Sequence, residues 1–224
     1  MINPFWYQST SGGDPDFASV VLLLPCDGTN GSTTFVDASS YGHTVTPSGN
    51  TQITTTNPKF GTGAALFDGS GDHMAIPHNA AFNFGTGDFT IEFHARWTSK
   101  SNFQAVYVMG SAAGSIRIQT GDSNGLFTIT IGGGVTTTES GAQPDVGTWY
   151  HYAFIRSAGN MRIFRDGVQR ASNTNSGSVS QTATIQIGST GTGSSFNGRL
   201  DNFRVTAIAR DPGDLPPTEA YPTS

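Results

Sequence analysis

The sequence contains a single cysteine, Cys26, among its 224 residues. One cysteine excludes a disulfide within the chain, so the fold must be stabilised by a hydrophobic core. A chain of this length can bury a sufficient core without disulfides or metals. Cys26 follows an apolar run, which predicts a buried and inert thiol.

Charged residues are also scarce, at 12% of the chain, and their balance is acidic. The chain has 11 Lys and Arg residues and 16 Asp and Glu residues, and only two of the basic residues are lysines, Lys59 and Lys100. Nucleic-acid-binding proteins present a basic stripe to the phosphates. The composition therefore argues against that class of protein.

Long apolar runs are missing as well. Residues 1–4, Met-Ile-Asn-Pro, are neither basic nor followed by an apolar stretch, so the sequence predicts no signal peptide. No run approaches the length that spans a bilayer. We therefore expect a protein that is made in a cytoplasm and makes no membrane contact.

Helical periodicity is absent, whereas 29 glycines and 11 prolines supply many tight turns. The clearest pattern is in residues 89–97, where Phe89, Ile91, Phe93, Ala95 and Trp97 alternate with Thr90, Glu92, His94 and Arg96. A period of two is typical of an antiparallel strand with one buried face, and it predicts that the face of Glu92 and His94 meets solvent. Further strands are expected at 20–24, 64–69, 72–77, 105–109, 115–119, 127–131, 135–138, 148–156, 161–165, 183–188 and 200–207. Many short strands with regular turns predict an all-β fold, an antiparallel two-sheet β-sandwich.

The two ends of the chain differ from this pattern. Residues 1–18 are predicted to form an N-terminal arm and linker, 19–208 the sandwich domain, and 209–224 a Pro-rich C-terminal tail. The arm carries Pro4, Phe5, Trp6 and Tyr7, and adjacent large aromatics are an apolar liability unless they are covered. These four residues are therefore predicted to bind a partner. A frayed terminus is the alternative interpretation.

Several motifs, taken in order, resemble one known family. The last strand, residues 196–205, reads F-N-G-R-L-D-N-F-R-V, and A-L-F-D-G at 65–69, D-F-T-I-E-F at 88–93 and G-T-W-Y-H-Y-A at 147–153 precede it. Together these are similar to the laminin-G-like, concanavalin-A-like jelly rolls, over roughly residues 20–208. The resemblance implies a jelly roll. It leaves the function open, because such folds serve sugar binding, catalysis and assembly.

Catalysis is the first of these functions to test, because glucanases share the jelly roll. Retaining glycosidases need two carboxylates about 5–5.5 Å apart, which closely spaced acids on one strand supply. The three glutamates, Glu92, Glu139 and Glu219, have no acidic partner in such a pattern. The five histidines are scattered, with His94 expected in solvent and His151 expected as a buried, hydrogen-bonded residue. We therefore predict that the protein is not an enzyme.

The resemblance also implies one cofactor, calcium. In related jelly rolls an aspartate at the start of the last strand often meets acidic turns near the first strand, and Asp201, Asp27 and Asp37 occupy these positions. Carboxylate and carbonyl oxygens are the ligands that Ca²⁺ prefers. Asp201 has the parity of Phe203 and Val205, which predicts that it points inward. The alternative is that Asp201 accepts backbone N–H bonds or pairs with an arginine.

The resemblance extends to structural proteins of tailed bacteriophages. It implies a non-enzymatic virion protein, a capsid decoration or head-fibre protein, located in the virion and partnered by the major capsid protein. The aromatic arm predicts a homo-oligomer, most simply a trimer. The alternative function is a lectin-like carbohydrate-binding module or tail adhesin that binds host glycans. A glycan site needs an exposed aromatic with flanking amides or carboxylates, and Tyr107, Phe103 with Asn102 and Gln104, and the loop 173–175 are candidates.

Overall fold

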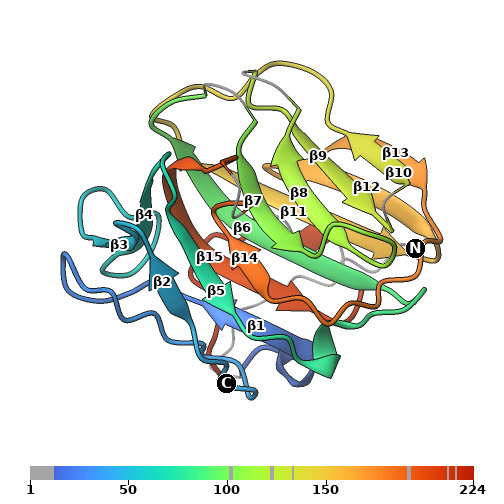
Figure 1. Ribbon diagram of the computed structural model, residues 1–224, viewed down its shortest axis with the longest axis horizontal. Coiled ribbons are helices and arrows are strands. Elements are labelled where there is room, and N and C mark those ends of the chain that lie inside the picture. Colours follow the sequence, from blue (N-terminus) through green and yellow to red (C-terminus); the bar gives the residue numbers. More distant parts are fainter. Residues whose placement is uncertain are drawn as a thin grey trace, which may run out of the picture.

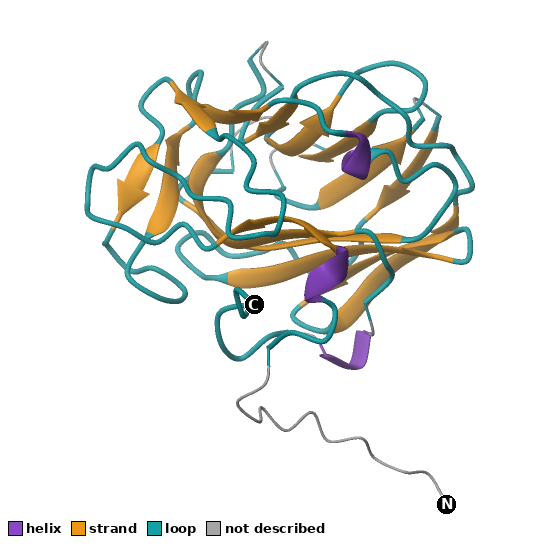
Figure 2. Ribbon diagram, turned by 90° about the horizontal axis from the view of Figure 1, so that it is seen from below, coloured by secondary structure: helices purple, strands orange, loops and turns teal. Residues whose placement is uncertain are grey.

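The computed structural model describes residues 13–100, 103–121, 124–132, 134–190, 193–210, 212–214 and 216–224. It is a sandwich of two antiparallel β-sheets, as the sequence predicts (Figure 1). Sheet A contains eight strands in the order β13-β12-β11-β6-β15-β4-β3, with β1 added against β15. Sheet B contains seven strands in the order β10-β9-β8-β7-β14-β5-β2. Figure 2 shows the sandwich turned by 90°.

The strands of sheet A are β1 (Val20–Leu24), β3 (Gln52–Thr54), β4 (Ala64–Asp68), β6 (Phe89–Trp97), β11 (Tyr150–Ser157), β12 (Asn160–Arg165), β13 (Val168–Thr174) and β15 (Asn197–Thr206). Those of sheet B are β2 (Thr46–Ser48), β5 (His73–Ile76), β7 (Ala105–Met109), β8 (Ile116–Thr120), β9 (Phe127–Ile131), β10 (Val135–Thr138) and β14 (Ile185–Ile187). Three short 3₁₀ helices are η1 (Phe17–Ser19), η2 (Ala80–Phe82) and η3 (Pro212–Asp214). No helix within the described ranges is long and apolar enough to cross a membrane.

The main core fills the space between the two sheets. Phe93 of β6 is fully buried and stacks on Phe203 of β15 at 5.3 Å between ring centroids. It also meets Phe127 of sheet B edge-on at 5.8 Å. Buried aromatics of this kind supply much of the area that leaves water on folding. The alternating residues Phe89, Ile91, Phe93, Ala95 and Trp97 are buried in this core as predicted, together with Ile163, Phe203 and Val205.

The opposite face of β6 differs from the prediction. Thr90, Glu92 and His94 were expected in solvent, yet their exposed fractions are 0%, 0% and 1%. The cause is a second layer on the outer face of sheet A, made by residues 13–18, the loop 55–63 and residues 207–210 and 216–224. Asp14 N donates to the carbonyl of Ser224 at 3.0 Å, so both ends of the described chain meet in this layer. Alternation alone cannot distinguish a face in water from a face that the chain's own ends cover.

A bulge in β15 corrects a second prediction. The register of β15 against β6 shifts between Asp201 and Arg204, and Asn202 takes a left-handed φ of 51° at this point. The bulge changes the parity of the strand. Asp201 therefore pairs with His94 and lies on the outer face of sheet A, whereas Phe203 and Val205 point into the core.

Candidate functional site

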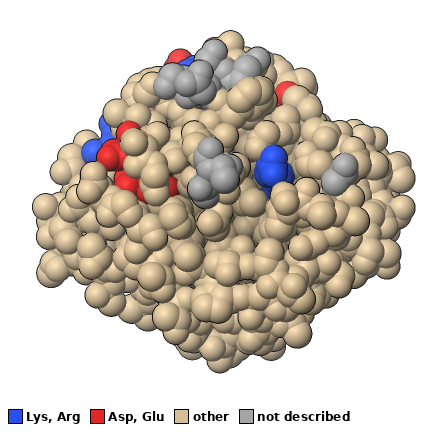
Figure 3. Space-filling view, viewed as in Figure 1, with Lys and Arg blue, Asp and Glu red and all other residues tan. Residues whose placement is uncertain are grey.

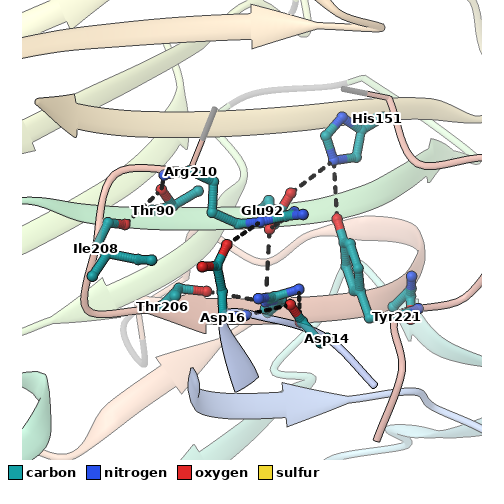
Figure 4. Close-up of polar contacts among 11 residues, drawn as sticks. Asp14, Asp16, Thr90, Glu92, His151, Thr206, Ile208, Arg210 and Tyr221 are labelled. Carbon is teal, nitrogen blue, oxygen red and sulfur yellow. Dashed lines mark hydrogen bonds and ion pairs between the residues drawn. The ribbon is translucent and has the colours of Figure 1, made fainter. Parts of the chain in front are cut away.

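A buried cluster of charged residues lies between sheet A and the terminal layer (Figure 4). Glu92 is at its centre. Arg210 Nη1 donates to Glu92 Oε1 at 2.6 Å, Arg204 Nε lies 3.9 Å from the same oxygen, and His151 Nε2 lies 3.4 Å from Glu92 Oε2. Because buried charges are stable only when they are paired, these contacts join β6, β11 and β15 to the C-terminal segment.

Two further residues complete the Glu92 cluster. Arg204 Nη1 bonds Asp14 Oδ2 at 2.6 Å, and the Tyr221 hydroxyl lies 3.2 Å from His151 Nε2. Burial by itself raises the pKa of Glu92, but the neighbouring Arg210, His151 and Arg204 outweigh it and hold that pKa well below its usual 4.5. An ionised, sealed carboxylate of this kind anchors the chain ends. It has no surface at which to meet a substrate, since Glu92 is fully buried.

His94 and Asp201 continue this buried layer along the next row of the sheet. His94 of β6 pairs with Asp201 of β15 in the sheet, and the His94 ring lies 4.9 Å from the His151 ring between centroids. Burial, helped by the nearby His151 and Lys59, lowers the pKa of His94 to about 2. Burial raises the pKa of Asp201 to about 7, against the opposing effect of its backbone hydrogen bonds. His94, predicted in solvent, is thus a neutral buried ring.

The three predicted calcium ligands each have separate partners. Asp201 Oδ2 accepts from the backbone N–H groups of Lys59 and Phe60 at 2.7 and 3.1 Å, which is the alternative considered from the sequence. Asp27 Oδ1 accepts from Thr62 and Gly63. These contacts bind the 59–63 loop to the middle of β15 and to the turn that follows β1.

Asp37, the third predicted ligand, organises a different loop. Its Oδ1 accepts from the N–H groups of Leu23 at 3.0 Å and Ser39 at 2.9 Å, and its Oδ2 accepts from Ser39 Oγ at 2.9 Å and His43 N at 2.8 Å. Within the described parts of the chain, no group of three or more metal-ligating side chains forms. The trio therefore does not fit a shared calcium site, and calcium binding stays a prediction that the structure does not test.

The predicted glycan-binding residues divide between surface and interior: Asn173 and Thr174, at the end of β13, are exposed, whereas Asn175 is 1% exposed. Tyr107 is fully buried, and the Gln104 side chain, 1% exposed, donates to the carbonyl of Ser99 and accepts from Asn197 N. Phe103 is 52% exposed, but its predicted partner Asn102 lies outside the described residues. The predicted partner-binding residues Pro4, Phe5, Trp6 and Tyr7 also lie outside them.

An aromatic groove that the sequence did not indicate lies beside Tyr41. Its volume is about 450 Å³, and it is bounded by η1, the loop 39–43, η2, the turn 83–88 and the residue after β15. Tyr41 forms one wall and is 46% exposed. Asn83 and Asp88 contribute the polar groups of the other wall, and small side chains such as Ala18 complete the lining.

The Tyr41 wall is held rigidly. Its ring stacks on His43 at 5.5 Å with 13° between the planes, and His43 in turn packs on Phe82 at 5.0 Å. His43 Nε2 lies 3.1 Å from the carbonyl of Val21 on β1. The four hydrogen bonds of Asp37 fix the loop that carries both rings. A ligand that stacks on Tyr41 would therefore lose little affinity to the ordering of this loop.

The polar wall is equally fixed. Arg156 is fully buried, and its guanidinium donates to the carbonyls of Gly85, Gly87 and Gly177, each at 2.7 Å. Asn83 Oδ1 accepts from Gln181 N at 2.9 Å, which leaves the Asn83 amide N–H₂ as a donor without a partner in the described chain. Asp88 Oδ1 accepts from Ala158 N at 2.9 Å, and its second oxygen has no such bond there. The groove thus offers an aromatic face, an N–H donor and a carboxylate acceptor.

Comparisons with known proteins agree with the fold. Residues 68–215 match the family model described as the concanavalin A-like lectin/glucanases superfamily. Comparison with curated proteins finds no match.

Similar solved structures are binding domains of toxins. The binding domain of botulinum neurotoxin DC in complex with SialylT is 19% identical, with a TM-score of 0.65 over 89% of this chain and 50% of that one. The binding domain of Paraclostridial Mosquitocidal Protein 1 is 15% identical, with a TM-score of 0.69 over 88% of this chain and 51% of that one. The chain therefore spans about half the length of these proteins. At such identities the likeness shows the fold, and it gives no support to the predicted place in a phage particle.

Proposed function

The chain belongs to the concanavalin A-like lectin/glucanase superfamily, and within it we propose a non-catalytic, lectin-like domain that binds a carbohydrate in the Tyr41 groove. The observation that carries the proposal is the combination of a rigid, half-exposed aromatic ring with a free amide donor and a free carboxylate oxygen. Ligand sites typically combine apolar and aromatic surface with a few fixed polar groups.

Each element of the groove matches one part of a sugar. The flat face of a pyranose presents C–H groups that pack on an aromatic ring such as Tyr41. Its hydroxyl groups both donate and accept hydrogen bonds, so they pair with the Asp88 oxygen and the Asn83 amide. The volume of about 450 Å³ lies within the usual range of ligand pockets, about 300–1,000 Å³.

The positions of the acidic residues favour a binding function over catalysis. Asp88 is the single carboxylate among the described residues that line the groove, whereas glycosidases use two. Glu92 is sealed in the terminal layer. Glu139 is 2% exposed, accepts from Phe127 N at 3.0 Å and pairs with Arg165 at 3.2 Å. Among the similar toxin structures, one binding domain is in complex with SialylT, and cell entry of botulinum neurotoxin type C depends on interaction with two ganglioside molecules; both agree with a binding role.

A glycan array followed by titration tests the proposal. We expect the wild type to bind at least one glycan and Tyr41→Ala to weaken that binding about fivefold or more, since loss of an aromatic contact costs about 1 kcal/mol. Phe103→Ala is the matched control, because Phe103 is a similarly exposed aromatic that does not line the groove. Retained affinity in Tyr41→Ala, or equal loss in both variants, would refute this site.

A further inference from the structure

A second hollow lies on the outer face of sheet B, away from the Tyr41 groove, and it also measures about 450 Å³. Three neighbouring strands form its floor, and each contributes one residue. Arg117 of β8 pairs with Val108 of β7, and Val108 pairs with Gln186 of β14, so the three lie side by side across the sheet. Ser111 and Thr184 add hydroxyl groups at the rim. The face of the molecule that includes these strands carries few charged side chains (Figure 3).

Arg117 is the charged residue among the described residues that line this hollow. Its side chain is half-buried, and the guanidinium makes no hydrogen bond or ion pair with any described residue. Arg204 and Arg210, by contrast, are bonded to carboxylates. A half-buried guanidinium has lost part of its hydration, so a partner anion would stabilise it.

The remaining lining selects the kind of anion. Among the described residues that line the hollow none is acidic, although the chain as a whole carries a net charge of −5. Val108 gives the floor an apolar centre, and the Gln186 amide has no partner in the described chain. A simple inorganic anion would use the guanidinium alone. A larger ligand that carries a carboxylate, an apolar ring face and hydroxyl groups would use all of these features.

We propose that the Arg117 hollow is a second binding site, which takes an acidic sugar through a paired contact between the guanidinium and the sugar carboxylate. The planar guanidinium binds a carboxylate with two parallel hydrogen bonds. Gln186 and Ser111 pair with the hydroxyl groups of the ring, which packs over Val108. This site shares no residue with the Tyr41 groove, so it does not depend on the proposed function of that groove.

Titration of the full chain with glucuronic acid and sialic acid, each beside its methyl ester, tests the proposal. The ester keeps the sugar and removes the charge. We expect each acid to bind at least about tenfold more tightly than its ester, which corresponds to one charge-assisted pair, and higher salt to reduce this difference. Equal binding of acid and ester would overturn the proposal, and so would acetate binding as tightly as the acidic sugars.

Four variants assign the site. Arg117→Gln should abolish the preference for the acid over the ester, and Arg117→Lys should retain only part of it, because lysine keeps the charge without the planar pair of donors. Arg162→Gln, on β12 of the opposite sheet, is the matched control and should bind as the wild type does. Tyr41→Ala should also leave the acid preference unchanged, which separates this site from the Tyr41 groove. An Arg117→Gln variant that still prefers the acid would refute the assignment.

Discussion

Replacement of Glu92 by glutamine tests how the terminal layer is attached. The substitution keeps the shape of the side chain but removes a fully buried negative charge that faces Arg210 at 2.6 Å, His151 at 3.4 Å and Arg204 at 3.9 Å. Removing one partner of a buried ion pair costs about 3–5 kcal/mol, because the opposite charge stays buried without compensation. We expect a loss near the lower end, about 3 kcal/mol, since Asp14 still pairs with Arg204.

Thermal and urea unfolding measure this loss. A change of 1 kcal/mol shifts the melting temperature of a domain of this size by about 2–4 °C, so Glu92→Gln should melt about 6–12 °C lower. Glu219→Gln, at an exposed glutamate in the same tail, is the control and should stay within about 0.5 kcal/mol of wild type. A loss below about 1 kcal/mol for Glu92→Gln would show that the cluster does not hold the layer.

The pH dependence follows from the sign of the pKa shift. The folded protein holds the pKa of Glu92 below its usual 4.5. The stabilisation is therefore complete above about pH 4.5 and is lost as the pH falls toward the folded pKa. The difference in unfolding free energy between wild type and Glu92→Gln should shrink between pH 6 and pH 3. A difference that does not change with pH would contradict an ionic origin.

Further predictions concern the neighbouring groups. The pKa of Asp201 is raised to about 7 in the folded protein, so the unfolding free energy should fall as the pH rises from about 4 to 7 and Asp201 ionises. Asp201→Asn should therefore flatten the dependence of the unfolding free energy on pH between pH 5 and 8. An unchanged dependence would contradict the raised pKa. Tyr221→Ala should cost about 3 kcal/mol in urea unfolding, because Tyr221 is 5% exposed and packs under Arg204; a cost below 1 kcal/mol would show that the tail is not anchored there. If calcium binds at Asp201, EDTA should lower the melting temperature of the wild type but not that of Asp201→Ala. A wild-type melting temperature that EDTA does not change would contradict the calcium prediction. If the aromatic arm binds a second copy, deletion of residues 1–12 should weaken self-association in ultracentrifugation without changing the melting temperature. Unchanged self-association would support the alternative interpretation, a frayed terminus.

The sandwich could be predicted from the sequence because its signals are local. The alternation at 89–97 and the turn dipeptides at Asp68-Gly69 and Asp166-Gly167 act within one or two strands. The position of Asp201 could not be predicted in this way. Its parity follows from the left-handed backbone of Asn202, and the N-F-R-V sequence around it also fits an unbroken strand.

The outer layer and the groove depend on contacts between distant parts of the chain. Glu92 and His94 are buried because residues 13–18, 207–210 and 216–224, more than 70 positions away from the strand in either direction, lie over them. The predicted linker residue Asp14 is bonded to Arg204 for the same reason. The Tyr41 groove joins segments from η1 to Ala207, and no single segment carries its signature. Asp37 fixes the loop that carries Tyr41 through four hydrogen bonds, one of them to Leu23, whereas its place in the sequence predicts a metal ligand.

The most direct test of carbohydrate binding is to map a bound glycan onto the surface by NMR. Isotope-labelled protein would be titrated with the best neutral ligand from the array, and the backbone amide shifts followed. We predict that the largest changes cluster at Tyr41, Asn83 and Asp88 and disappear in Tyr41→Ala. Changes confined to another surface, or no ligand from the array at all, would contradict the proposal that this domain is a lectin with its site beside Tyr41.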